Sequence, residues 1–111
     1  MKTNVIWSED AGNELVDIIT YIKCNSGKIT ADRIYKKINT EIGKVCQNAR
    51  SRRISPLLKQ FGITAIHQVN VNPWIIYYRV DESIMEIISI IDGRRNLAEI
   101  LYQKVIDGKI K

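Results

Sequence analysis

The sequence predicts an α+β domain with the element order β-α-α-β-β-β, in which a helical hairpin packs on a small, mainly antiparallel sheet. Apolar residues recur at helical spacing in two consecutive stretches, residues 11–22 and 31–45. Three segments rich in β-branched and aromatic residues follow, at residues 65–71, 74–80 and 84–91. Because the chain has only 111 residues, we expect one domain with one shared core.

The N-terminal elements begin with a short strand at residues 5–7, and Ser8 is placed to cap the helix that follows. Residues 25–27 (Asn-Ser-Gly) end this helix, and Thr30 is the expected cap of the second helix. The short strand has no hairpin partner near it in the sequence. We therefore expect it to join an edge of the sheet or to pair with the last strand.

The helical periodicity disappears in residues 47–64, which predict a basic connection with Pro56 outside any helix. Turns are predicted at residues 72–73 (Asn-Pro) and at residues 81–83, between the three strands. Residues 97–105 have apolar side chains at helical spacing. They allow a C-terminal helix, which we expect to fray into the Lys-rich end of the chain.

Positive charge is in excess, with 17 Lys and Arg residues against 12 Asp and Glu residues and a formal net charge of +5. Five basic residues and no acidic residue lie between Lys44 and Lys59, whereas the first 22 residues are acidic. Such blocks suit phosphate or an acidic protein, and equally a solvated surface that keeps a small domain soluble. The charge thus predicts an acidic partner without identifying it.

Membrane insertion and secretion are not predicted. The longest nearly apolar run, residues 84–91, is interrupted by Glu86 and Ser89 and is too short to cross a bilayer. No apolar segment follows Met1 and Lys2, so this end of the sequence gives no support for secretion. We expect a cytoplasmic protein that makes no contact with a membrane.

Residues that commonly bind metals, nucleotides or small substrates are few. Two cysteines, Cys24 and Cys46, and a single histidine, His67, form neither a disulfide framework nor a metal-binding cluster. No glycine-rich loop joins a strand to a helix. We therefore expect no cofactor, no metal and no small-molecule substrate. His67 is expected to be a partly buried structural residue, and the cysteines to be buried or half-buried thiols rather than nucleophiles.

Two consecutive arginines, Arg94 and Arg95, follow the last predicted strand and are candidates for a functional surface. The sheet would hold their backbone while the guanidinium groups face outward, a geometry that suits bidentate binding of phosphate or carboxylate. Pairing with Asp92 or Glu99 would instead make them a purely structural basic cluster. The sequence leaves both interpretations open.

Arg79 lies inside a predicted strand and shares one face of that strand with Ile75 and Tyr77. The opposite face carries Trp74 and Tyr78, which we expect to be structural. If that face packs on the helices, Arg79 and Tyr77 lie on an open face of the sheet. A protein partner or an RNA could stack and pair there.

Three segments of the sequence form a recognisable set: residues 5–11 (VIWSEDA), 72–80 (NPWIIYYRV) and 84–96 (IMEIISIIDGRRN). Taken together, they resemble the RelE/ParE superfamily, the toxins of bacterial type II toxin–antitoxin systems. The resemblance extends from the first strand to Arg95 and fits the predicted fold. In the family the last segment typically ends in His-Gly/Ala-Arg-Arg, and Asp92 stands at the histidine position here.

RelE-like members of the superfamily are ribosome-dependent mRNA endonucleases that use several basic residues and a C-terminal tyrosine. In this chain residues 65–71 contain no lysine, Ile75 stands where an arginine is expected, and Tyr102 lies out of register. Losing most of the groups that stabilise developing charge lowers such a rate by orders of magnitude. A metal-independent endoribonuclease would have to rely on Arg94, Arg95, Arg79, Tyr102 and His67.

ParE-like members lack that catalytic set and have a long helical hairpin, as this chain does. That branch inhibits DNA gyrase by binding it, without a chemical reaction, and is associated with plasmid stabilization. The resemblance therefore favours a gyrase-binding, ParE-like toxin over an enzyme. The target-binding residues that it implies are Arg94, Arg95, Tyr77 and Arg79.

Both branches imply an acidic cognate antitoxin that wraps the toxin and neutralises it in a heteromeric complex. The resemblance leaves two other functions open. One is a RelE-like endonuclease acting on mRNA at the ribosome, and the other is an inactive member that retains only antitoxin binding. It also divides the chain into a toxin domain of residues 1–96 and a basic amphipathic extension of residues 97–111.

Overall fold

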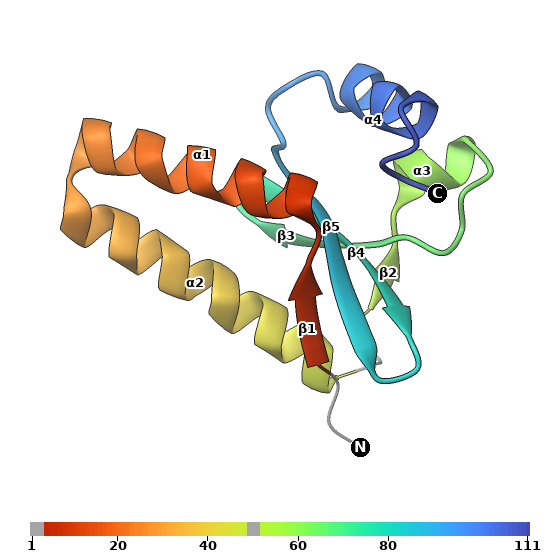
Figure 1. Cartoon of the computed structure of the whole chain (residues 1–111), viewed down its shortest axis with the longest axis horizontal. Helices are drawn as coiled ribbons and strands as arrows, with labels where there is room; N and C mark the ends of the chain where they lie inside the picture. Colours follow the sequence, from red (N-terminus) through yellow and green to blue (C-terminus); the bar gives the residue numbers. More distant parts are fainter. Residues whose placement is uncertain (1–3, 49–51) are drawn as a thin grey trace.

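The computed structural model describes residues 4–48 and 52–111, which contain a five-stranded sheet in the order β1-β5-β4-β3-β2 (Figure 1). The elements in chain order are β1 (Asn4–Trp7), α1 (Glu9–Ser26), α2 (Lys28–Gln47), β2 (Arg53–Ile54), α3 (Pro56–Gln60), β3 (His67–Val71), β4 (Trp74–Asp81), β5 (Ile84–Asp92) and α4 (Leu97–Ile106). The α1–α2 hairpin packs on one face of the sheet, and α3 and α4 lie on the other. The predicted α+β fold, with its helical hairpin and C-terminal helix, is confirmed.

The N-terminal strand joins the sheet at an edge. β1 pairs in parallel with β5, with Asn4 opposite Ile84 and Trp7 opposite Ile87. The other neighbouring strands are antiparallel. The strand therefore lies both at an edge and beside the last strand, as its lack of a hairpin partner predicted.

Ser8 connects β1 to α1 and holds this junction against β5. Its hydroxyl oxygen accepts a hydrogen bond from the Ala11 backbone N–H at 3.1 Å, which confirms the predicted N-cap. The same hydroxyl donates to the Ile88 carbonyl at 3.2 Å, and the Ser8 N–H donates to the Ile87 carbonyl at 2.9 Å. The start of α1 is thus fixed by the sheet as well as by its own cap.

A single residue, Gly27, separates α1 from α2. Its φ of 90° is readily adopted by glycine and strained for other residues. The Gly27 N–H donates to the Lys23 carbonyl and its carbonyl accepts from the Ala31 N–H, both at 3.1 Å. The prediction of Thr30 as the cap is wrong, because Gly27 makes the reversal alone and α2 already begins at Lys28.

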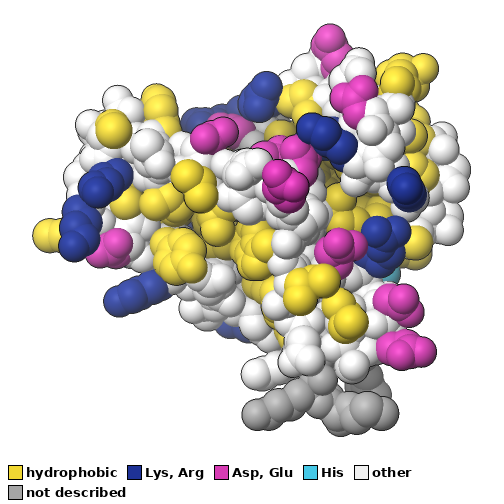
Figure 2. Space-filling model, viewed as in Figure 1, with side chains coloured by type: hydrophobic (Ala, Val, Ile, Leu, Met, Phe, Trp, Pro, Cys, Tyr) yellow, Lys and Arg dark blue, Asp and Glu magenta, His cyan; other side chains and the backbone are white. Residues whose placement is uncertain are grey.

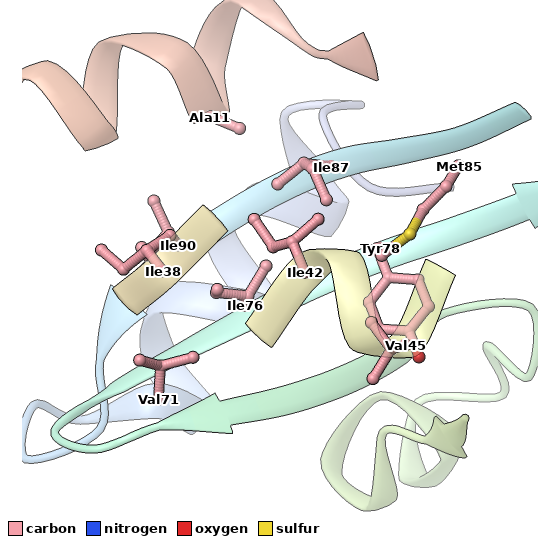
Figure 3. Close-up of a cluster of buried hydrophobic side chains, with 10 residues drawn as sticks. All are labelled: Ala11, Ile38, Ile42, Val45, Val71, Ile76, Tyr78, Met85, Ile87 and Ile90. Carbon is pink, nitrogen blue, oxygen red and sulfur yellow. The ribbon is translucent and has the colours of Figure 1, made fainter. Parts of the chain in front are cut away.

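Two clusters of buried side chains lie on the two faces of the sheet. The first joins the hairpin to the strands (Figure 3), and its buried members are Ala11, Ile38, Ile42, Val45, Val71, Ile76, Tyr78, Met85, Ile87 and Ile90. The second joins α3 and α4 to the strands, and its buried members are Leu58, Ile66, Tyr77, Ile88, Ile91, Leu101 and Ile110. β4 and β5 contribute to both clusters and are buried on both sides.

The connection between α2 and β3 contains two short elements that the sequence analysis did not predict. β2 pairs with β3, placing Arg53 opposite Gln68, and α3 follows at once. The Ser55 hydroxyl caps α3 by accepting from the Leu58 N–H at 3.3 Å. The prediction that Pro56 lies outside any helix is wrong, because Pro56 occupies the first turn, where its missing N–H leaves no bond unmade.

The prediction that the C-terminal segment frays is wrong. After α4 the chain returns to the sheet, where Ile110 is only 2% exposed and belongs to the second cluster. Burial of this side chain holds the segment against the sheet, although its lysines predicted that it would be exposed to solvent. No helix in the described part of the chain combines the length and apolar composition needed to cross a membrane.

Candidate functional site

Arg94 and Arg95 lie in the loop between β5 and α4, directly against the turn between β3 and β4. The Gly93 N–H donates to the Pro73 carbonyl at 2.7 Å. A Cβ atom at Gly93 would lie 3.0 Å from the Pro73 oxygen and 3.3 Å from the Ile75 side chain, so only glycine fits without displacement. This close approach fixes the backbone from which both arginines project.

Arg94 pairs with Asp92, as one of the two interpretations of the sequence expected. Nη2 lies 2.7 Å from Oδ2, Nε lies 3.0 Å from Oδ1, and the Arg94 backbone N–H donates to Oδ1 at 2.9 Å. These side-chain and backbone hydrogen bonds lower the pKa of Asp92 to about 2. The Arg94 side chain is nevertheless 77% exposed, so its fork is accessible to an anion that competes with Asp92.

Arg95 is the more available of the two cations. Its backbone N–H donates to the Asp92 carbonyl at 3.1 Å. Its exposed side chain makes no ion pair within residues 4–48 and 52–111, so pairing with Glu99 is not seen. Arg95 borders a pocket of about 650 Å³ beside α4, which Ile100 and Lys104 also line. Arg94 borders a second pocket of about 390 Å³ with Trp74 at the β3–β4 turn.

A group of ion pairs, which we call the α1–α4 clasp, fixes α4 beside this loop. It consists of Asp10 and Glu14 on α1 with Lys104 and Lys109. The Lys104 ammonium group, on a side chain only 12% exposed, binds Asp10 and lies 3.2 Å from Glu14, while Lys109 lies 3.2 Å from Asp10. Burial alone would raise the pKa of Asp10, but the hydrogen bonds from Lys104 and Lys109 outweigh it and the pKa is lowered.

The clasp also reaches the sheet. Glu14 Oε1 accepts from the Ser89 hydroxyl at 2.8 Å and from the Ile90 N–H at 3.3 Å. The sequence analysis missed this group, although its signal was present as an acidic N-terminal block and a basic tail. Opposite charges at the two ends of a small domain can pair, but their partners are fixed only by the fold.

The expectation of an open sheet face around Arg79 and Tyr77 is wrong. Tyr77 is 1% exposed in the second cluster, and burial raises its pKa to about 12. Arg79 pairs with Glu86 at 3.1 Å and donates to the Lys111 carbonyl at 3.4 Å. The face is covered because α3, α4 and Ile110 pack onto it.

His67 is half-buried on the opposite, hairpin side of the sheet, as expected for a structural histidine. Its ring stacks on Tyr78, with ring centroids 5.5 Å apart. Burial and the nearby positive charge of Arg52 lower the pKa of His67. His67 Nδ1 and the Tyr78 hydroxyl are buried and have no hydrogen-bond partner within the described residues.

The remaining candidates lie apart from this histidine. Tyr102 is 55% exposed on α4 and contacts Phe61, with ring centroids 5.9 Å apart. Cys46 is half-buried as expected, whereas Cys24 is exposed and its predicted burial is wrong, because the end of α1 extends beyond the sheet. Residues 4–48 and 52–111 hold no cluster of side chains that could bind a metal ion.

The five residues considered for a nuclease do not converge. Trp74 pairs with Asp92 at one end of β4, next to Arg94, whereas Arg79 pairs with Glu86 near the other end. Five residues of strand separate these two positions, which is about 17 Å. His67 lies on the other face of the sheet, and Tyr102 projects from α4. Arg94 and Arg95 thus lie on an exposed basic loop between two pockets, apart from the other three residues.

Comparisons with known proteins agree with this fold. A solved structure described as "Chromosomal ParDE TA system from P. aeruginosa" superposes with a TM-score of 0.65, at 16% identity, over 81% of this chain and 95% of that chain. A search of curated protein sequences finds no match. A family described as "ParE toxin of type II toxin-antitoxin system, parDE" matches residues 5–97. The chain therefore belongs to the ParE toxin family of type II toxin–antitoxin systems.

Proposed function

We propose that the protein is a growth-inhibiting toxin that binds DNA gyrase in the bacterial cytoplasm and carries out no chemical reaction. The family match over residues 5–97 carries this proposal. The dispersal of His67, Arg79, Arg94 and Tyr102 over the fold supports it, because charge stabilisation in a transition state requires groups that converge on one point. Binding requires only an accessible surface.

The gyrase-binding surface in this proposal is the β5–α4 loop with its two flanking pockets. Arg95 supplies an unpaired cation, and Arg94 supplies a fork that can exchange Asp92 for a carboxylate or phosphate of the target. Arg79 lies outside this surface, and Tyr77 is too deeply buried to contribute. The proposal thus retains the arginine pair from the sequence analysis and drops the open sheet face.

A cognate antitoxin is the second partner in the proposal. Large apolar side chains are exposed on the helical hairpin: Val16, Tyr21, Ile29 and Tyr35 are 62%, 70%, 87% and 47% exposed. An acidic peptide that folds onto the toxin would bury such residues, while the net charge of +5 would speed its encounter. The antitoxin would therefore stabilise the hairpin as well as inhibit the toxin.

The test compares gyrase inhibition by the wild-type protein with that of a variant carrying Arg94→Ala and Arg95→Ala. Purified protein is added to a DNA supercoiling assay with gyrase, and the chain is expressed alone in a bacterium. We expect wild-type protein to inhibit supercoiling, and the variant to lose at least tenfold in potency. A control with Lys23→Ala and Lys59→Ala removes the same charge from exposed positions on α1 and α3, outside the loop sequence.

Three outcomes would contradict the proposal. Rapid loss of translation with cleaved mRNA would identify a RelE-like endonuclease instead. A folded protein that binds its antitoxin but never slows growth would identify an inactive member. Equal loss of potency in the loop variant and the control would show that the β5–α4 loop is not the binding surface.

A further inference from the structure

The outer face of α2 carries a row of positive charge. α2 contains five basic residues and two acidic ones. Four of its basic residues are exposed and lie on the side of the helix opposite the buried residues, at 100° per residue. We call them the α2 basic row: Arg33, Lys36, Lys37 and Lys44. In Figure 2, dark-blue side chains project along the left and lower-left margin, where Figure 1 places the hairpin.

This positive charge is only partly balanced by the two acidic residues of α2 itself, Asp32 and Glu41. The acidic residues of the neighbouring α1 that lie closest to the sheet, Asp10 and Glu14, are held by the α1–α4 clasp on the far side of that helix. Within residues 4–48 and 52–111, Arg33, Lys36 and Lys37 make no ion pair. Lys44 pairs with Glu41 at 3.1 Å, but its side chain remains 67% exposed. An external anion therefore meets little internal competition here.

The spacing of the row suits a polyanion with regularly repeated charges. Arg33 and Lys44 are eleven residues apart, a rise of about 16 Å along the helix axis. Over that length, each strand of a DNA duplex carries about five phosphates. One face of α2 could therefore meet several phosphates at once.

The chemistry of this face favours nucleic acid over a protein partner. The same face carries Thr40 and Gln47, which are polar and exposed. Tight protein interfaces depend on buried aromatic or aliphatic anchors, and the outer face of α2 offers only Ile29, at the tip of the hairpin. Electrostatic binding to phosphates needs no such anchor.

We propose that the α2 basic row binds the phosphate backbone of duplex nucleic acid, without reading its sequence. This surface is separate from the loop of Arg94 and Arg95, which lies beside α4. The inference does not depend on gyrase binding, and either property can fail while the other holds. A toxin with both would be concentrated along DNA, where it could search for a DNA-bound target.

The test measures binding of the full chain to a labelled 20-base-pair DNA duplex by fluorescence anisotropy, at salt concentrations from 50 to 200 mM. Four phosphate contacts predict a slope of about −3.6 in log K against log salt, a loss of about 150-fold over this range. A variant with Lys36→Glu and Lys37→Glu should bind at least tenfold more weakly, with a slope shallower by about 2. A second duplex of unrelated sequence should bind within about twofold of the first.

A control variant with Lys23→Glu and Lys59→Glu has the same net charge as the α2 variant, and both of its positions are exposed. We expect it to bind DNA within about threefold of the wild-type protein. Circular dichroism checks that each variant is folded. If the charge-reversal variant with Lys36→Glu and Lys37→Glu unfolds, a variant with Lys36→Gln and Lys37→Gln takes its place. Three results would overturn the proposal: no binding by the wild-type chain at 50 mM salt, equal losses in the two variants, or displacement of DNA by polyglutamate of equal charge.

Discussion

Replacing Lys104 by methionine should destabilise the protein strongly, because this residue is the centre of the α1–α4 clasp. Removing one partner of a fully buried ion pair lowers the free energy of unfolding by about 3–5 kcal/mol, whereas an exposed pair contributes only about 0–1 kcal/mol. The Lys104 side chain is 12% exposed, and those of Asp10 and Glu14 are 26% and 24% exposed. The site thus lies nearer to the buried limit, and we expect a loss of about 2–3 kcal/mol.

A loss of this size should lower the melting temperature by about 8–12 °C in a chain of this length. Urea unfolding followed by circular dichroism measures the free energy, and calorimetry measures the melting temperature. Lys44→Met is the matched control, because Lys44 also pairs with a carboxylate but is 67% exposed. It should cost less than about 1 kcal/mol.

The effect of Lys104→Met should also depend on pH in a defined direction. Because the pKa of Asp10 in the folded protein is lowered below 3.8, the clasp contributes its stability above that pH. This contribution is lost as the pH falls through the lowered pKa, where Asp10 becomes protonated. The stability difference between wild type and variant should therefore be full at pH 6 and shrink below pH 4. Equal stabilities at pH 6, or a difference unchanged at low pH, would refute this account of the clasp.

Three further substitutions test single contacts by urea unfolding. Gly93→Ala should cost about 1–3 kcal/mol, since its Cβ would meet the Pro73 oxygen at 3.0 Å; a neutral result would mean that the β3–β4 turn can move away. Ser8→Ala should cost about 1 kcal/mol by removing the α1 cap, and an unchanged midpoint would contradict that role. Tyr78→Phe removes a buried hydroxyl that has no partner within the described residues, so its stability should be equal or higher; a clear loss would reveal a hydrogen bond to that hydroxyl.

The fold was largely predictable because its main elements are indicated by local sequence patterns. The helical hairpin follows from apolar residues at helical spacing, and Ser8 marks the start of α1 without reference to distant residues. The prediction that Thr30 caps the second helix failed because Gly27 reverses the chain three residues earlier, although Thr30 is a good capping residue. β2 and α3 were missed because elements of two and five residues carry no period of their own.

The site was less predictable, because it depends on which segments cover which face of the sheet. Alternation along β4 correctly separated Tyr77 from Tyr78. It could not show that α3, α4 and Ile110 pack over Tyr77 and remove it from the surface. The pairing of Arg94 with Asp92 could be offered as one of two interpretations because it spans two residues, whereas the clasp joins residues about ninety positions apart.

The parallel pairing of β1 with β5 has a consequence for the synthesis of the protein. β1 is made before its partner residues, Ile84 to Ile87, which come 80 positions later in the chain. Until they leave the ribosome, the N-terminal strand has no neighbour, and the hairpin has only part of the sheet to pack on. Closing so large a loop is entropically costly and slows folding. The complete five-stranded sheet can therefore form only after residues 84–87 have been made and have left the ribosome.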